Sequence, residues 1–396
     1  MASYAFKKLV IDARTGLNPR TNFVLGNGDN YYITIKDIHD GQIEISDKTD
    51  RVDDAAIEMI KKRSRIKNGD VLFTSIGRLG ETAIVSNKDD TWDVNESVFV
   101  FTLDTGIITP KYFCALMASR SVQERLKRDS SGSTFKSIKM NQLEKMKFNV
   151  PDLPTQRRIA ATLDAVTTLI AKRHQQLDAL DQLVKARFVE MFGDPGKNPF
   201  GWNVSTVGKL ISLCESGWSG NGTQHEKKNG EIAVLKVSAV TKGYFIPTEC
   251  KVLDDQESIK KYVYPQAGDL LFSRANTREL VGATAVITED YPEYILPDKL
   301  WKIRFIETAN VWFMKYILSS EPIRAIFSSV SNGTSGSMFN VSMEKLKLIK
   351  IPLPPIELQN QFAAFVTQVD RSKAAVQQSL QSLETLKKSL MQQYFG

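Results

Sequence analysis

The chain has 396 residues, of which 42% are hydrophobic and 24% are charged, and this composition favours a folded protein of two or three domains over a disordered or fibrous one. The sequence contains no apolar run of the roughly 18 residues that a membrane-spanning helix requires, and its first residues lack the apolar core of a signal peptide. The net charge of +7 is compatible with a polyanionic partner, and the odd number of cysteines, without metal-ligand spacing, favours a reduced cytoplasmic protein: Cys114, Cys214 and Cys250.

The first half of the chain begins with a polar loop, and strands and a short helix are predicted after it. The loop has the sequence RTGLNPRTNF (14–23), and the segment YITIKDIHDGQI (32–43) contains a strand. The basic run KKRSRIK (61–67) follows DDAAIEMI, so we expect it to end a helix whose acidic start and cationic end suit the helix dipole; phosphate binding is the alternative. A Gly-Asp turn then leads into the strand NGDVLFT (68–74).

A proline-rich segment leads from the first globular half into a long helix. The loop SGSTF (131–135) precedes this segment, whose sequence is VPDLPTQRRIAATLDAV (150–166). No Gly or Pro occurs between Gln156 and Met191, so at 1.5 Å per residue a helix of ~54 Å is predicted. The FGDPG sequence that follows has the Gly and Pro residues typical of a helix end.

The second half of the chain repeats these blocks in the same order, about 200 residues later. The repeats are AVLKVSAVTKGYF (233–245), AGDLLFS (267–273), SGSMF (335–339) and IPLPPIELQNQFAAFV (351–366). Four matched blocks in one order indicate a duplicated domain; the alternative is two unrelated domains that share common turns. The loops between the blocks differ, and loops on a shared scaffold usually carry binding specificity.

Both long helices carry an apolar stripe at alternating spacings of four and three residues, which over about five heptads is typical of a coiled-coil seam. Because each helix follows a globular segment, we expect the two helices to pair antiparallel within one chain; pairing with another chain is the alternative. The predicted fold is α+β, a pseudo-twofold repeat of two mixed α/β domains (1–150 and 196–350) and two helical spacers (151–195 and 351–396). The predicted seam residues are Ile159, Leu163, Val166, Ile170, Leu177, Leu180, Val184, Phe362, Val366, Val369, Val376, Leu380, Leu383 and Leu390.

The sequence lacks the motifs of a self-sufficient active site. It contains no Walker A motif, no His-Glu-x-x-His and no Gly-rich cofactor loop after a strand, and its three histidines are isolated. We therefore expect a chain that is not an enzyme and that itself binds no metal and no cofactor.

The two proline-to-helix segments, together with ARFVEMFGDP (186–195) and LKKSLMQQYFG (386–396), resemble the specificity (S) subunits of type I restriction-modification systems. The RTGLNPRTNF loop and the two Gly-Asp strands are similar to the target-recognition domains of that family. The second domain begins SLCESGWSGNGTQ (212–224), without the Gly-Leu-Asn-Pro of the first, so loop residues do not transfer between the domains.

The resemblance implies a non-catalytic subunit of a DNA adenine methyltransferase and endonuclease complex in the prokaryotic cytoplasm, with no membrane contact. Each domain would recognise one half of a bipartite, asymmetric target in double-stranded DNA. The helices would set the half-site spacing and dock two methyltransferase (M) subunits that bind S-adenosylmethionine. Restriction (R) subunits that use ATP and Mg would join them. The alternative is a coiled-coil scaffold that presents two protein-interaction domains without binding DNA.

We expect DNA contacts from loop residues with hydrogen-bond donors, because Arg and Asn bond well to purine edges, whereas Ser and backbone amides suit phosphates. The SGS loop is shared by both domains, so it suits phosphate better than base recognition. An ordinary solvated surface group is the alternative for each residue. The candidates are Arg14, Asn18, Arg20, Asn22, Lys36, Ser75, Arg78, Ser133, Thr134 and Lys136 in the first domain and Trp218, Ser219, Lys236, Arg274, Asn276, Arg278, Ser335 and Ser337 in the second.

Overall fold

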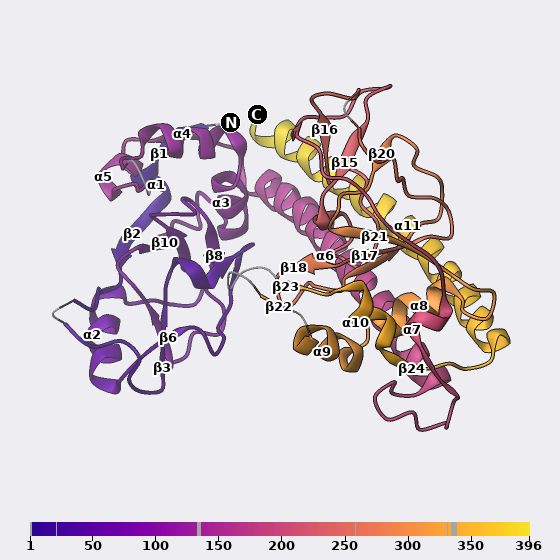
Figure 1. The fold of residues 1–396 in the computed structure, drawn as a ribbon. Helices are drawn as coiled ribbons and strands as arrows, with labels where there is room; N and C mark the ends of the chain where they lie inside the picture. The colour runs from indigo at the N-terminus through magenta and orange to yellow at the C-terminus, as the bar shows by residue number, and fades with distance from the viewer. Residues whose placement is uncertain (1, 21, 133–135, 258, 331, 334–338) are drawn as a thin grey trace. The chain divides into compact units, whose positions relative to one another are not determined.

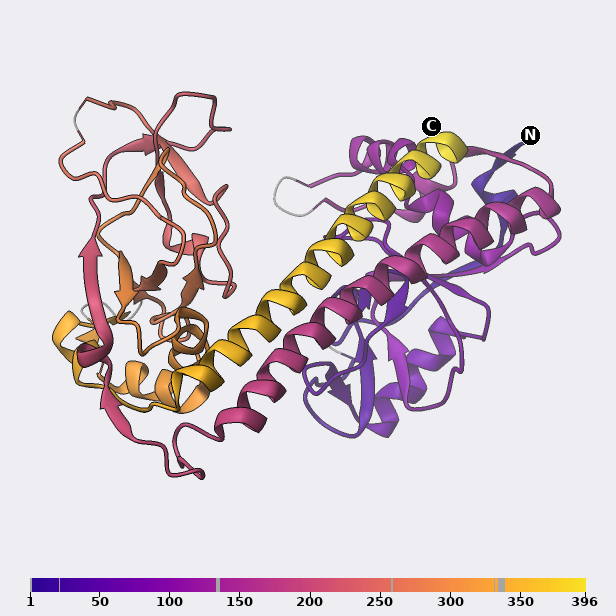
Figure 2. The same cartoon turned by 90° about the vertical axis from the view of Figure 1, so that its right-hand side faces the viewer.

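The computed structural model describes residues 2–20, 22–132, 136–257, 259–330, 332–333 and 339–396 (Figure 1). The chain divides into two compact units: unit 1 comprises 1–174 and 378–396, and unit 2 comprises 175–377. Each unit contains one globular domain and part of each of two helices of 40 residues, α6 (Leu153–Phe192) and α11 (Ile356–Phe395), shown in Figure 2. Among the described residues, no helix is long and apolar enough to cross a membrane.

The centre of unit 1 is a four-stranded antiparallel sheet with both faces buried. Alternate residues of one strand enter two different cores, Phe99 and Phe101 on one face and Val98 and Val100 on the other. Such two-sided burial explains why the strand is a continuous apolar run. The strand order is β2 (Val10–Thr15), β10 (Val98–Leu103), β7 (Val71–Thr74) and β8 (Thr82–Ile84).

Smaller elements surround this sheet. Strand β1 (Ala2–Ala5) pairs with β11 (Lys147–Val150), so the two ends of the globular domain lie together. A second sheet has the order β6 (Asp50–Val52), β3 (Asn30–Ile33) and β9 (Trp92–Val94), with β3 parallel to β9. The remaining elements are α1 (Phe6–Leu9), η1 (Ile35–Asp37), β4 (Ile38–His39), β5 (Gln42–Ile43), α3 (Pro110–Met117), α4 (Arg120–Asp129) and α5 (Met140–Leu143).

Helix α2 (Asp54–Ser64) contains the basic run of the first half in its last turn, as predicted. The Asp53 carboxylate caps its start by accepting a hydrogen bond from the Ala56 N–H at 2.8 Å. Arg65 ends the helix in the left-handed conformation, with φ of 46°. The cationic residues just before Arg65 face the negative end of the helix dipole.

Unit 2 repeats the architecture of unit 1. Its central sheet has the order β13 (Ile211–Ser216), β21 (Leu300–Phe305), β17 (Leu270–Ser273) and β19 (Thr284–Val286), and β12 (Val204–Thr206) pairs with β24 (Lys350–Pro352). The second sheet has the order β14 (Gly222–Thr223), β16 (Cys250–Leu253), β15 (Ala233–Leu235) and β20 (Tyr294–Ile295), again with one parallel pair. The other elements are α7 (Val207–Leu210), η2 (Val237–Ala239), β18 (Ala275–Asn276), α8 (Val311–Leu318), α9 (Glu321–Val330), β22 (Asn332–Gly333), β23 (Phe339–Asn340) and α10 (Met343–Leu348).

Two features show how closely the two units resemble each other and where they differ. A Cβ atom on Gly16 would lie 1.7 Å from the Val94 carbonyl oxygen, and one on Gly217 would lie 1.7 Å from that of Leu296, so the same close approach recurs in both units. In contrast, the described residues between β16 and β17 form no helix that corresponds to α2. The strands of the scaffold are therefore present in both units, whereas no described helix takes the place of α2 in unit 2.

A buried glutamine follows the proline lead-in in both units. The Gln156 side chain is fully buried at the start of α6, where its amide donates to the Ile107 and Pro151 carbonyls at 2.8 and 2.9 Å. Its Oε1 accepts from the Thr109 N–H, just before α3, at 2.9 Å. Gln359 makes the same three kinds of bond at the start of α11, to backbone groups of Thr308, Asn310 and Pro354. Each glutamine thus joins the long helix to the domain before it.

The two long helices pair antiparallel within the chain, as predicted. In unit 2, Phe188 and Phe192 of α6 contact Phe362 of α11, with ring centroids 5.4 and 5.5 Å apart. Asp181, earlier on α6, forms an ion pair with Lys373, later on α11. Residues with higher numbers on α6 therefore contact residues with lower numbers on α11, which defines an antiparallel pair.

The opposite ends of the helices meet in the core of unit 1. That core contains Ile159 and Leu163 of α6, with Leu390 and Tyr394 of α11 packed against it. Along the seam, the buried residues are Ile159, Leu163, Val166, Val184, Phe362, Val366, Val369 and Val376, and the half-buried ones are Ile170, Leu177, Leu180, Leu380, Leu383 and Leu390.

Candidate nucleic-acid interface

The loop after β7 in unit 1 lies beside the chain that follows the SGS loop. Ile76 and Ser137 form an antiparallel bridge, and the Ile138 N–H donates to the Ser75 carbonyl at 2.9 Å. The Gly77 N–H donates to the Lys136 carbonyl at 3.2 Å. These backbone bonds bring two predicted residues, Arg78 and Lys136, to one edge of the domain, where both are exposed.

Arg78 connects this edge to a third segment. Its guanidinium contacts the His39 ring, donates to the Ile35 carbonyl at 3.1 Å and lies 3.6 Å from the Glu81 carboxylate. These contacts place the exposed Lys36, in η1, near the Arg78 loop. Sequence reasoning missed His39, because its contact with Arg78 joins positions 39 residues apart.

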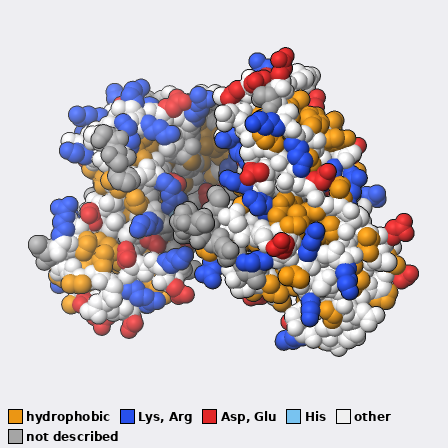
Figure 3. All heavy atoms as spheres, viewed as in Figure 1, with side chains coloured by type: hydrophobic (Ala, Val, Ile, Leu, Met, Phe, Trp, Pro, Cys, Tyr) orange, Lys and Arg blue, Asp and Glu red, His pale blue; other side chains and the backbone are white. Residues whose placement is uncertain are grey.

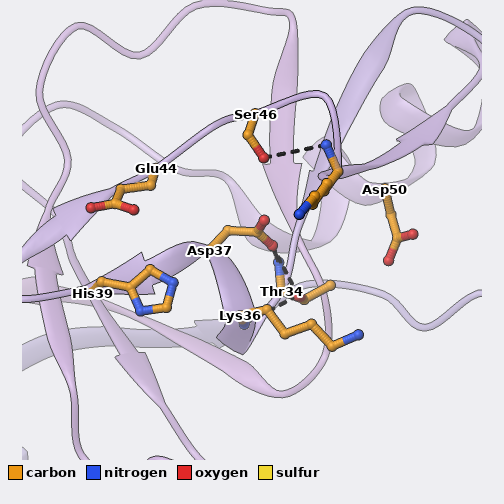
Figure 4. Close-up of a pocket in the computed structure, with 8 residues that line it drawn as sticks. Thr34, Lys36, Asp37, His39, Glu44, Ser46 and Asp50 are labelled. Atoms are coloured by element: carbon orange, nitrogen blue, oxygen red, sulfur yellow. Dashed lines mark hydrogen bonds between the residues drawn. The ribbon is translucent and has the colours of Figure 1, made fainter. Parts of the chain in front are cut away.

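Figure 4 shows a polar pocket in this region, with the Lys36 ammonium extending away from His39. Asp37 is structural here, since it accepts hydrogen bonds from Thr34 at 2.8 and 2.9 Å and from Thr49 at 2.9 Å. The lining includes cations and carboxylates, a mixture of donors and acceptors that suits base edges better than phosphates alone. The lining residues are Thr34, Lys36, Asp37, His39, Glu44, Ser46, Lys48 and Asp50.

The prediction that Arg14 lies in an exposed loop is wrong. Arg14 is part of β2 and only 7% exposed, and its guanidinium pairs with Asp70 at 2.9 Å and also bonds to Thr102 and to the Arg65 carbonyl. Asp70 is buried as well, and its carboxylate closes the Gly-Asp turn by accepting a hydrogen bond from the Lys67 N–H. A buried carboxylate requires a counter-charge, and Arg14 supplies it.

The same arrangement in unit 2 explains why the Gly-Asp sequence recurs. Asp269 is fully buried, accepts from the Gln266 N–H at 2.6 Å and forms ion pairs with Lys302 at 3.1 Å and Arg304 at 2.6 Å. The cation comes from a different strand in each unit, β2 in unit 1 and β21 in unit 2. The motif is therefore a structural feature of the scaffold.

Ser75 also differs from the prediction of an accessible loop donor. It is 7% exposed, and its hydroxyl donates to the Ser97 carbonyl at 2.7 Å, so it supports the loop from inside. The other N-terminal candidates lie in a local turn, where Asn22 donates to the Asn18 carbonyl at 2.9 Å and the exposed Arg20 has φ of 24°. Phe23 packs edge-on against Tyr32 of the second sheet, which places this turn on the α2 side of the domain.

In unit 2 the loop after β17 meets the chain at β23 in the same way. The Val341 N–H donates to the Arg274 carbonyl at 2.9 Å, and Asn276 pairs with Phe339. The half-buried Arg274 side chain donates to the Asp298 carbonyl at 3.1 Å, whereas Arg278 is exposed, with its guanidinium 5.9 Å from the Phe339 ring centre.

The remaining unit 2 candidates have local partners. Trp218 is half-buried and packs against a small core of the second sheet, and the exposed Ser219 bonds to Asp298. Lys236 forms an ion pair with Glu249 at 2.9 Å. Four predicted residues lie outside the described ranges: Ser133, Thr134, Ser335 and Ser337. Within those ranges, no group of three or more His, Cys, Asp or Glu side chains is placed to hold a metal ion.

Comparison with protein families matches most of the chain. The model described as the type I restriction modification DNA specificity domain matches residues 9–182 and again 199–385. This double match coincides with the duplication seen in the structure.

Individual relatives are distant and only partly aligned. The chain is 24% identical to the EcoKI specificity subunit of Escherichia coli K12 over 67% of this chain and 60% of that protein. It is 25% identical to the E. coli EcoEI specificity subunit over 42% of this chain and 28% of the relative. For the putative MjaX specificity subunit of Methanocaldococcus jannaschii the identity is 26%, over 50% and 47%. The chain thus spans between 28% and 60% of the length of these relatives.

Solved structures share the fold over nearly the whole chain. The S subunit of a type I restriction-modification system from M. genitalium superposes with a TM-score of 0.58 at 14% identity, covering 98% of this chain and 94% of that one. A chain from a study of type I R-M complex assembly and conformational transition gives a TM-score of 0.56 at 17% identity, covering 100% and 97%. At these identities the likeness concerns the fold.

Proposed function

Since the chain belongs to the type I restriction-modification DNA specificity domain family, we propose that it is a DNA-sequence-specificity subunit. Each of its two units recognises one half of a bipartite, asymmetric target in double-stranded DNA. The chain itself is non-catalytic and acts in the prokaryotic cytoplasm.

The observation that carries this proposal is a shared scaffold with different side chains at the equivalent edge. The same backbone bond joins Ile138 to Ser75 in unit 1 and Val341 to Arg274 in unit 2. At that edge, unit 1 presents exposed lysine and arginine side chains, whereas in unit 2 an arginine lies over the Phe339 ring. One frame with two sets of side chains is expected of a protein that recognises two different half-sites, because base edges are distinguished by their donors, acceptors and apolar groups.

The antiparallel helices supply the second element of the proposal. Aromatic and ionic contacts fix their register, so the pair can set the separation of the half-sites. A change of one base pair demands a shift of ~3.4 Å and a rotation of ~34°, since DNA has about 10–10.5 base pairs per turn. The pseudo-twofold repeat offers two similar places for two M subunits, which bind S-adenosylmethionine and methylate adenine. R subunits that use ATP and Mg complete the complex.

DNA titration of the chain, alone and with its M subunits, tests this function. The expected result is binding to random-sequence duplex that weakens steeply with salt, because phosphate neutralisation releases counterions. The competing function is a coiled-coil scaffold that presents two protein-interaction domains. Absence of salt-dependent binding both with and without M would support the scaffold and overturn the proposal.

A further inference from the structure

The repeat makes it possible to compare α4 of unit 1 with α9 of unit 2 residue by residue. Ser119 precedes α4 and Ser320 precedes α9, and each hydroxyl donates to the carbonyl three residues earlier, at 2.7 and 2.6 Å. Each serine carbonyl also accepts the first helical bond, from Gln123 and Arg324 respectively, at 2.9 Å. The residues of α4 and α9 can therefore be aligned one to one, starting from these two serines.

Equivalent positions of these two helices, and of the segments that follow them, differ in charge. Lys127 of α4 corresponds to Ser328 of α9. Just before the next helix, Lys139 precedes α5 where Ser342 precedes α10. Between them, Lys136 stands two residues before Ile138, and Phe339 stands two residues before the equivalent Val341. Three lysines of unit 1 thus have uncharged counterparts in unit 2: Ser328, Phe339 and Ser342.

Local contacts hold the three lysines around the Arg78 loop. A Cβ atom on Gly80 would lie 2.6 Å from Leu126 and 2.7 Å from Gln123, so this loop packs directly on α4. The Gln142 side chain donates to the Asp129 carbonyl, which ties α5 to the end of α4. Ser131 and Ser137 exchange two backbone hydrogen bonds of 2.9 Å, which return the chain to the same edge.

The charges on this face are available to a ligand. Lys127, Lys136 and Lys139 are exposed, and within the described residues no carboxylate lies in ion-pair distance of them. The neighbouring Arg128 differs, because Asp129 pairs with it at 3.0 Å. Figure 3 shows Lys and Arg side chains gathered over α4 and α5.

We infer that Lys127, Lys136 and Lys139, beside Arg78, form a surface on unit 1 that binds the DNA phosphate backbone and that unit 2 lacks. Three cations without a carboxylate partner, next to the loop proposed to contact bases, suit the repeated negative charges of a duplex backbone better than a single anion. At these three positions unit 1 therefore makes phosphate contacts that unit 2 does not make. This inference rests on the proposed function.

The test measures the affinity of the chain with its M subunits for a random-sequence duplex over a series of KCl concentrations. The combined variant Lys127→Ala, Lys136→Ala and Lys139→Ala should flatten the slope of log K against log [salt] by about 2–3, at roughly 0.9 per lost phosphate contact. The combined Lys→Arg variant keeps the charges and should retain the slope. Lys209→Ala removes an exposed lysine from α7, at a position with no predicted DNA contact, and should leave the slope unchanged.

The outcomes separate this inference from the proposed function. Failure of the unmodified complex to bind DNA with salt dependence would overturn the proposed function. A wild-type slope in the triple Ala variant, or an equal loss in Lys209→Ala, would overturn the inference alone. The reverse change, Ser328→Lys, adds a lysine at the position of Lys127 and should steepen the slope by up to about 1. An unchanged slope there would contradict the difference between the two faces.

Discussion

Replacing either buried glutamine by methionine tests how the long helices are attached to the domains. Methionine is close to glutamine in length and volume, so Gln156→Met or Gln359→Met removes the hydrogen bonds without creating a large cavity. Each glutamine makes three bonds of 2.8 to 3.1 Å, all to backbone groups. A net value of about 1 kcal/mol per bond predicts that the free energy of unfolding falls by about 3 kcal/mol. The decrease is larger if water does not reach the backbone groups that lose their partner.

The loss should be local to one unit. For a unit of roughly 200 residues, 3 kcal/mol corresponds to a decrease in melting temperature of about 6–12 °C. Thermal unfolding measures this decrease, and hydrogen exchange followed by mass spectrometry shows its location. Gln156→Met should raise exchange in α3 and the start of α6, and Gln359→Met in α8 and the start of α11.

An exposed glutamine of the same helix provides the control. Gln175→Met should change the free energy of unfolding by less than about 0.5 kcal/mol, because surface substitutions away from special features have small effects. If Gln156→Met and Gln359→Met were as mild as this control, the buried amides would not be what joins helix to domain, and the reasoning would be refuted.

Two further substitutions test the seam and a buried charge. Phe362→Ala should destabilise unit 2 by about 3–5 kcal/mol in chemical denaturation, because this fully buried ring contacts Phe188 and Phe192; a loss below about 1 kcal/mol would contradict the aromatic core. Burial raises the pKa of Asp93, so its charged form destabilises the fold above that pKa. Asp93→Asn should therefore raise the melting temperature at pH 7.5, with a gain that shrinks as the pH falls towards the ordinary Asp value. A lower melting temperature at every pH would show that the nearby cations outweigh burial.

The sequence was most informative where one physical constraint acts along one element. The apolar stripe of each long helix predicted the seam because helical periodicity maps sequence spacing directly onto a face. The acidic start and basic end of 54–64 likewise predicted α2. The repeated proline-rich segment predicted the start of both helices, although the backbone partners of Gln156 and Gln359 could be identified only in three dimensions.

Prediction was weakest for side chains whose role depends on distant partners. Arg14 looked like a loop donor because its neighbours are polar, yet it sits in β2 opposite Asp70, a residue 56 positions away. The interpretation of Ser75 as an accessible loop donor was wrong for the same reason, since its hydroxyl points inward and donates to the distant Ser97 carbonyl. The Lys127 and Lys139 surface was missed because its significance appears only when α4 is compared with its counterpart in unit 2.

The central claim is that each unit recognises its own half of a bipartite DNA target. Exchanging residues 1–150 for the corresponding domain of another specificity subunit, followed by methylation mapping of the host genome by single-molecule sequencing, tests it most directly. The account predicts that one half of the methylated sequence changes while the other half and its adenine stay the same. A change in both halves, or in neither, would contradict it.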